Sequence, residues 1–241
     1  MKISRLMLSS HQGLGLLVGL QVVLWITGGF VMSALPLEKV RGEDWVAAPD
    51  PAGLPDGAPA LQAPDALARE LGLDGLTGAR LTTWLDRPVY ILESAGGPVL
   101  ADAVAGTRLS PLAAEMAREV ARRDYAGPGA VAGVREQTEP LIEIRGRELP
   151  LWRVDFDDSR HTTVYVSPHT GQVVARRNTV WRVYDVFWML HIMDYGGRDD
   201  FNHPLLVGAA VVAWLLAVSG AWLVVLWLRR RSRRRRGARG S

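Results

Sequence analysis

Two long apolar segments divide the chain. Residues 13–35 form 23 consecutive positions without a formal charge, and residues 204–228 form 25. A helix needs about 20 such residues to cross the hydrocarbon core of a bilayer. A cleaved signal peptide explains residues 13–35 poorly, because the stretch is longer than a usual signal core and no Ala-x-Ala site follows it. The pattern therefore predicts two transmembrane helices.

The chain between these segments has the mixed pattern of a folded domain. Residues 36–64 are rich in Pro, Ala and Gly, which predicts a linker. A helical pattern followed by extended segments then occurs twice, in residues 65–109 and in residues 110–178. Residues 179–203 hold an aromatic-rich helical pattern and a loop, and Trp and Tyr favour the headgroup level of a membrane. We therefore expect two helix-plus-sheet units followed by an interfacial helix.

Each unit is expected to pair its extended segments into an antiparallel sheet. A helix is predicted over residues 65–71 and another over residues 110–123, where Ser110 is a natural N-cap before Pro111. The predicted strands cover residues 79–84, 88–93 and 99–104, and then 131–136, 141–145, 151–156, 162–166 and 172–176. One unit of this size buries little core, so the two are expected to pack together.

The distribution of charge sets the predicted orientation. All 25 acidic residues lie in residues 36–203, where 18 basic residues leave a formal charge of −7. The other ten of the 28 basic residues lie near the chain ends, eight of them after residue 228. Lys and Arg mark the cytoplasmic side of a span. Residues 1–12 and 229–241 are therefore predicted to be cytoplasmic, with residues 36–203 on the periplasmic or extracellular side of a bacterial inner membrane.

The arginine run that begins at Arg229 has a second interpretation, because basic runs also bind nucleic acid. It directly follows the second apolar segment, where arginines anchor the topology and meet anionic lipid headgroups. The expected partner is therefore the lipid bilayer, and no nucleic-acid partner is expected.

Several reaction classes find no support in the sequence. The chain has no cysteine, which excludes disulfides, thiolate metal sites and cysteine nucleophiles. It also has no HExxH, no Gly-x-Ser-x-Gly, no phosphate loop and no dinucleotide fingerprint. No catalytic residue is predicted, and the sequence decides neither whether the protein is an enzyme nor whether it binds a metal.

Residues 163–174 resemble the closing signature of a PepSY domain, in which a strand runs into an Asp-Pro-x-Thr-Gly turn and a second strand. Here the turn reads Ser-Pro-His-Thr-Gly, so Ser167 stands where the pattern usually has Asp. The sequences around both spans, His11-Gln12-Gly13-Leu14-Gly15-Leu16, Leu190-His191-Ile192-Met193-Asp194-Tyr195 and Phe201-Asn202-His203-Pro204-Leu205, resemble the PepSY-associated transmembrane family. The resemblance implies an α+β membrane protein: two transmembrane helices flanking an extracytoplasmic domain of two PepSY-like helix-plus-antiparallel-sheet units. Residues 65–109 would be the degenerate copy.

Histidines are the remaining candidates for chemistry. His11 lies at the start of the first span, whereas His191 and His203 precede the second. His11 and His203 lie at opposite ends of their spans, roughly 35 Å of helix apart, so they cannot ligate one haem within a subunit. Asp194 follows His191 by three residues, where a carboxylate could orient its ring. The structural alternative makes His191 an interfacial side chain, His203 a cap residue and His11 a surface residue that reaches the headgroups.

The resemblance adds a functional expectation. Larger members of this family include reductases thought to move electrons across the membrane to ferric complexes, using histidines at span ends. On that basis His11, His191 and His203 are candidate ligands of haem b, and the chain is a candidate component of transmembrane electron transfer or ferric-complex reduction. Homodimerisation would provide four helices for such a site, and Gly15 with Gly19, or the alanines from Ala209 to Ala221, have the spacing that lets helices pack closely in lipid.

Two other functions stay open. A non-catalytic extracytoplasmic module could bind or regulate a peptide, a protease or a partner membrane protein, because small sheets expose strand edges. The chain could also be a purely structural subunit of a larger complex.

Overall fold

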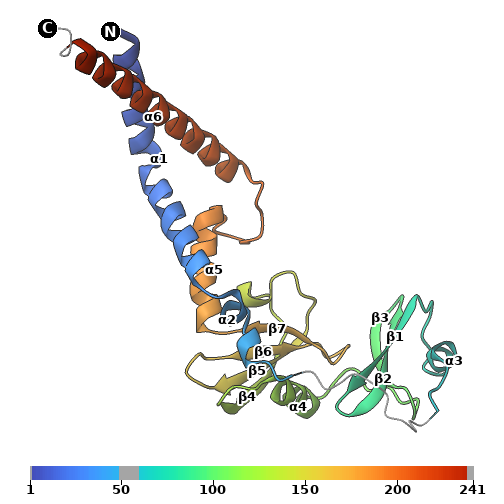
Figure 1. Ribbon diagram of the computed structural model, residues 1–241. Helices are drawn as coiled ribbons and strands as arrows, with labels where there is room; N and C mark the ends of the chain where they lie inside the picture. The colour runs from blue at the N-terminus through green and yellow to red at the C-terminus, as the bar shows by residue number, and fades with distance from the viewer. Residues whose placement is uncertain (1, 49–59, 238–241) are drawn as a thin grey trace. The chain divides into compact units, whose positions relative to one another are not determined.

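The computed structural model describes residues 2–48 and 60–237 and divides the chain into two compact units (Figure 1). The chain up to Leu35 and the chain from Val183 onward form one of them, here called the helical unit. Pro36–Arg182 form the other, the sheet unit.

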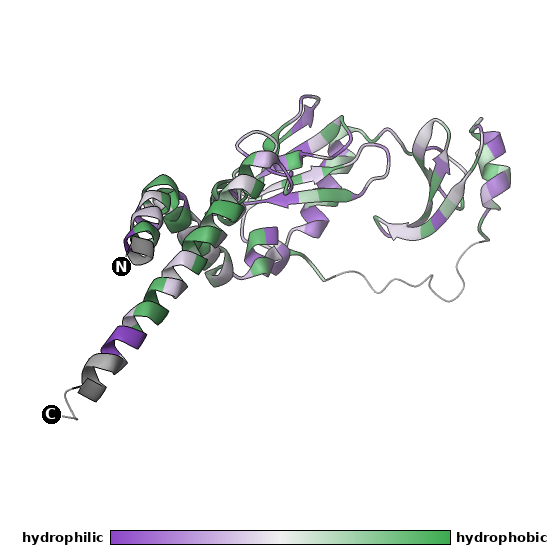
Figure 2. Cartoon of the chain, turned by 90° about the horizontal axis from the view of Figure 1, so that it is seen from above, coloured by the Kyte–Doolittle hydropathy of each residue, from purple (hydrophilic) through white to green (hydrophobic). Residues whose placement is uncertain are grey.

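Two long helices dominate the helical unit. Helix α1 spans Lys2–Ala34 and helix α6 spans Pro204–Gly237, and the two lie against each other. Both are long and apolar enough to cross a membrane, over Arg5–Ala34 and Pro204–Ser232. Most of their large apolar side chains are exposed, and Leu16 is 89% exposed, whereas the core helix of a soluble protein would bury such residues. Figure 2 shows hydrophobic residues along most of both helices. The two apolar helices predicted at the chain ends are confirmed.

The sheet unit begins with a small helix-plus-sheet half. Helix α3 (Pro64–Glu70) precedes strands β1 (Gly78–Trp84), β2 (Arg87–Ser94) and β3 (Gly97–Asp102). They form an antiparallel sheet in the order β1-β2-β3. The central strand β2 buries four consecutive residues, Val89–Leu92, and their side chains point alternately into the clusters on the two faces of the sheet.

The second half repeats this plan with one strand more. Helix α4 (Ala114–Asp124) precedes an antiparallel sheet in the order β4-β5-β6-β7. Its strands are Ala130–Gln137, Leu151–Asp157, Thr163–Val166 and Val173–Arg177. Helix α5 (Thr179–Ile192) follows at once, and the side chain of Asn178 caps it by accepting a hydrogen bond from Trp181 N at 2.8 Å.

A shared core joins the two halves, as predicted. Buried residues of β2, β3, α4, β5 and β6 form one cluster, and Trp84 at the end of β1 belongs to it. The Trp84 indole Nε1 donates to the carbonyl oxygen of Gly171 at 2.9 Å. Gly171 has a φ of +66°, and a Cβ there would lie 2.6 Å from that nitrogen. The glycine of the signature turn is therefore required for the two halves to meet.

Two local predictions were wrong. Residues 141–145 form no strand; they contain the 3-10 helix η2 (Ile142–Ile144), which buries Ile144 with Leu151, Tyr165 and Ala175. Ser110 does not cap a helix, since α4 begins only at Ala114. The Ser110 hydroxyl oxygen instead accepts a hydrogen bond from Leu100 N at 3.0 Å and so joins the helix entry to β3.

The predicted linker was also too long. Residues 36–48 contain helix α2 (Leu37–Arg41) and the 3-10 helix η1 (Glu43–Trp45). Asp44 pairs with Arg160 at 2.7 Å, and the Asn178 amide donates to the carbonyl oxygen of Lys39 at 2.9 Å. This stretch is therefore part of the sheet unit, while residues 49–59 of the predicted linker lie outside the described residues.

Candidate functional site

His11 is held between α1 and α6. Its Nδ1 lies 2.9 Å from the hydroxyl oxygen of Ser219, which itself donates to the carbonyl oxygen of Leu216 at 2.9 Å. Because a hydroxyl carries only one proton, Ser219 accepts a hydrogen bond from Nδ1–H of His11. The lone pair of the neutral imidazole is then on Nε2, and a hydrogen bond at the other ring nitrogen is the usual arrangement behind a metal-ligating histidine.

Gly220 makes room for this imidazole. A Cβ at Gly220 would lie 3.0 Å from Cε1 of His11, closer than ordinary van der Waals contact. The ring therefore packs directly against the backbone of α6, and the position and tautomer of His11 depend on two consecutive small residues, Ser219 and Gly220.

His191 has a similar position at the other end of α1. A Cβ at Gly28 would lie 3.8 Å from Nδ1 of His191 and 3.4 Å from the carbonyl oxygen of Phe187, so α5 approaches the α1 backbone closely. The side chain of Gln21 reinforces this contact by donating to the carbonyl oxygen of Leu190 at 3.1 Å. Within the described residues, Nδ1 of His191 is buried and has no hydrogen-bond partner.

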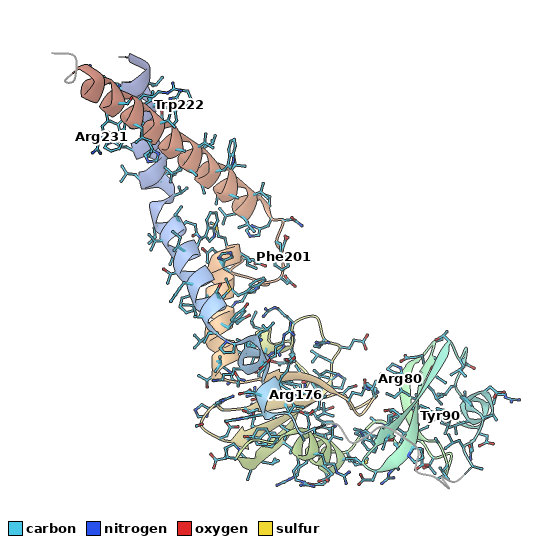
Figure 3. All side chains as sticks on the ribbon, viewed as in Figure 1. Arg80, Tyr90, Arg176, Phe201, Trp222 and Arg231 are labelled. Atoms are coloured by element: carbon cyan, nitrogen blue, oxygen red, sulfur yellow. The ribbon has the colours of Figure 1, made fainter. Side chains whose placement is uncertain are left out.

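A largely aromatic pocket of about 510 Å³ adjoins His191. Its walls come from α1, α5, the following loop and α6: Trp25, Trp188, His191, Ile192, Phe201 and Leu206. Trp188 packs edge-to-face on Phe201 with 5.3 Å between ring centroids and donates to the carbonyl oxygen of Arg198 at 3.0 Å. Phe201 projects from the loop just before α6 (Figure 3). The indole Nε1 of Trp25 is also buried without a partner in the part of the chain that the structure describes.

His203 has a structural bond that uses one of its ring nitrogens. Its Nε2 donates to the carbonyl oxygen of Ile192 at 3.0 Å, which satisfies one of the last carbonyls of α5.

The predicted pairing of Asp194 with His191 was wrong. The Asp194 carboxylate instead accepts hydrogen bonds from the backbone amides of the loop, at Asp200, Asp199, Gly196 and Gly197. These bonds, above all those from the amides of Asp200 and Asp199, lower the pKa of Asp194 to about 2.

The imidazoles of His11 and His191 lie at two separate levels of the helical unit. Along α1, 14 residues separate His11 from Trp25, a rise of about 21 Å. Along α6, a similar interval separates Leu206, in the pocket, from Ser219 beside His11. His11 and His191 therefore cannot hold one group together within a chain. Among the described residues, no three His, Cys, Asp or Glu side chains gather in a metal-binding arrangement.

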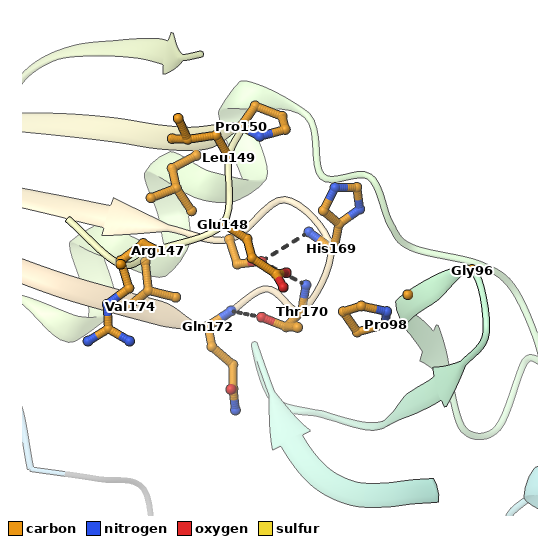
Figure 4. Close-up of a pocket in the computed structure, with 14 residues that line it drawn as sticks. Gly96, Pro98, Arg147, Glu148, Leu149, Pro150, His169, Thr170, Gln172 and Val174 are labelled. Atoms are coloured by element: carbon orange, nitrogen blue, oxygen red, sulfur yellow. Dashed lines mark hydrogen bonds between the residues drawn. The ribbon is translucent and has the colours of Figure 1, made fainter. Parts of the chain in front are cut away.

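The sheet unit has a different kind of pocket, at the signature turn (Figure 4). It measures about 640 Å³ and lies between the β2–β3 turn at Gly97, the loop at Arg147 and Glu148, and the β6–β7 turn at His169. The hydroxyl oxygen of Ser167 accepts hydrogen bonds from His169 N at 3.3 Å and Thr170 N at 3.2 Å. Serine thus supplies the turn bonds that an aspartate would make at this position.

Several residues of the histidine sites were not found from the sequence. They are Trp25, Gly28, Trp188, Phe201, Ser219 and Gly220. The adjacent Ser219 and Gly220 are a signal in hindsight, since a polar and a small residue interrupt an otherwise bulky apolar run.

The fold and these sites define a membrane protein with two long apolar helices around a domain of two antiparallel sheets. The profile of the PepSY-associated TM region matches residues 8–241. The chain therefore belongs to the PepSY-associated TM region family. Comparisons with curated proteins and with solved structures find no significant match.

Proposed function

We propose that this membrane protein is a component of transmembrane electron transfer, with His11 and His191 as ligands of haem b at two levels of the helical unit. One observation carries the proposal. Each of these imidazoles packs against a glycine of the neighbouring helix, His11 against Gly220 and His191 against Gly28. Such a fixed ring orientation is what a metal ligand requires.

The residues around His191 suit haem. Its pocket is lined by aromatic and aliphatic side chains, which favour a large apolar ring, and a neutral imidazole is a usual axial ligand. Haem, when bound, supplies one-electron chemistry. The chain's own residues would set its environment, because Trp25 and Trp188 line the pocket and Gln21 holds α5 on α1.

The charge distribution supports a direction across the membrane. With both termini cytoplasmic, His11 would lie near the cytoplasmic face and His191 near the periplasmic or extracellular face of a bacterial inner membrane. Electrons would then pass between a cytoplasmic partner and an acceptor outside, with a ferric complex as the substrate class. A second copy of the chain would supply a second imidazole at each level, and Gly19 leaves space for it, since no described atom lies within 4 Å of a Cβ built there.

The direct test is a reduced-minus-oxidised absorption spectrum of the full-length protein, purified in detergent after expression with haem supplied. We expect a reducible b-type spectrum, with one part lost in His191→Ala and another in His11→Ala. His203→Ala should keep the bands, because Nε2 of His203 caps α5, and His169→Ala on the exposed turn serves as the matched control. A spectrum without reducible bands would overturn the proposal.

A second candidate function rests on the pocket at the signature turn. Its volume and its charged rim at Arg147 and Glu148 suit an extended peptide or a loop of a partner protein. A photo-crosslinking residue in place of His169 should then yield one discrete adduct in cells, and the same residue in place of exposed Arg80 should not. Equal labelling from both positions would count against this function.

A further inference from the structure

Two arginines of the sheet unit stack on one indole at the start of α5. The guanidinium carbons of Arg177 and Arg145 lie 4.4 Å and 5.7 Å from the centroid of the Trp181 ring. Arg177 comes from the end of β7, whereas Arg145 directly follows η2. Residues from three elements thus bring two cations and an aromatic ring together.

The charge of Arg177 is not neutralised by a carboxylate within the described residues. Its guanidinium donates to two backbone carbonyl oxygens, of Glu143 at 2.6 Å and of Arg176 at 2.7 Å. The Glu143 carboxylate is already occupied, because it accepts hydrogen bonds from Arg182 at 2.7 Å and from the Tyr165 hydroxyl at 2.8 Å. Arg147, exposed on the same loop, makes no ion pair with any residue that the structure describes.

Burial makes this concentration of positive charge costly. It is the main cause that lowers the pKa of Arg177 to about 10, and the neighbouring charges of Arg145 and Arg147 lower it further, against the attraction of Glu143. A bound anion would relieve this repulsion and accept hydrogen bonds from Arg177 and Arg147, since arginine matches the oxygens of a phosphate.

Apolar side chains beside this cluster point to a lipid as the source of the anion. Ile142 of η2 is 37% exposed and Leu37 of α2 is 49% exposed, although both are large and apolar. The hydrogen bond from Asn178 to the carbonyl oxygen of Lys39 holds α2 beside the start of α5. Exposed aliphatic residues, arginines and a tryptophan together are typical of a surface that lies in the headgroup layer of a membrane.

We propose that the surface formed by Ile142, Arg147, Arg177 and Trp181 binds the phosphate of an anionic phospholipid headgroup. Trp181 lies in the first turn of α5, which starts at Thr179. The headgroup contact would then fix the sheet unit to the bilayer surface. This inference does not depend on haem binding.

The test uses amide hydrogen exchange of the full-length protein in nanodiscs, comparing phosphatidylcholine alone with phosphatidylcholine that contains phosphatidylglycerol. We expect the amides of residues 142–147 to exchange several-fold more slowly with phosphatidylglycerol, and high salt should remove the difference. Arg147→Ala should weaken the dependence on phosphatidylglycerol about fivefold, because one arginine contributes about that factor near an anionic surface. Arg80→Ala, an exposed arginine on β1, is the matched control.

Three outcomes would overturn the proposal. The first is equal exchange of residues 142–147 in both kinds of nanodisc, and the second is an unchanged dependence on phosphatidylglycerol in Arg147→Ala. The third is the same protection from inorganic phosphate in phosphatidylcholine nanodiscs, which would assign the surface to a free anion. The haem spectrum is measured separately, so either proposal can fail alone.

Discussion

The helical unit and the sheet unit place their histidines in different surroundings. His11 and His191 pack against glycines of a neighbouring helix, whereas His161 and His169 are exposed on loops of the sheet unit. An imidazole needs a fixed orientation to act as a ligand, and close packing provides this orientation in the helical unit alone. The sheet unit instead presents arginines, a signature turn and a pocket. Under our proposals, the helices carry the chemistry and the sheets carry the recognition.

The largest expected effect comes from destabilising the sheet unit, which tests whether the redox spectrum depends on the helical unit alone. Trp84→Ala removes a buried indole and its bond to Gly171, which should destabilise the sheet unit by about 3–5 kcal/mol. Amide exchange of β2 and β5 in the full-length protein would report the loss, and Leu81→Ala, at an exposed position of β1, should have little effect. The redox spectrum should remain, and its disappearance together with the sheet protection would contradict the assignment of chemistry to the helices.

The next effect concerns the position of His11. Gly220→Ala places a methyl group 3.0 Å from Cε1 of the ring, and overpacking of this kind costs about 1–3 kcal/mol. We expect the His11-dependent part of the spectrum to shift or vanish while the part due to His191 persists. Gly208→Ala on the same helix is the control, because no described atom lies within 4 Å of its Cβ position. Identical spectra for both variants would show that the Gly220 contact does not position the ring.

These experiments address what the sequence could not determine. Freedom from charge over 13–35 and 204–228 was enough to predict both long helices, because crossing a bilayer demands apolar length. Seven of the extended segments predicted from the sequence are strands, but the segment 141–145 contains η2, because Ile144 is buried by tertiary packing that no local pattern reports. The candidate histidines were identified by residue type and by their positions near the ends of the predicted spans. Ser219, the partner of His11, and Gly28, beside His191, lie on other helices than their histidines. Local periodicity does not predict which helices pack together.

A smaller effect is expected in the loop that closes the His191 pocket. The pKa of Asp194 is lowered to about 2 by the loop amides, so its contribution to loop stability is present above the unfolded pKa of about 3.9 and is lost as pH falls through about 2. Relative to the intrinsic exchange rate at each pH, the protection of the amides of residues 196–200 should therefore fall between about pH 4 and pH 2. Asp194→Asn should show fast exchange already at neutral pH. An unchanged loop in that variant would mean that the four amide bonds do not order it.

The most direct measurement of the central claim is electron transfer across a vesicle membrane. The full-length protein would be reconstituted with a ferric complex trapped inside and a membrane-impermeant reductant outside. The account predicts reduction of the trapped complex by the unaltered protein, loss of that reduction in His11→Ala and in His191→Ala, and normal rates in His169→Ala. Equal rates in vesicles with the unaltered protein and in vesicles without protein would contradict it.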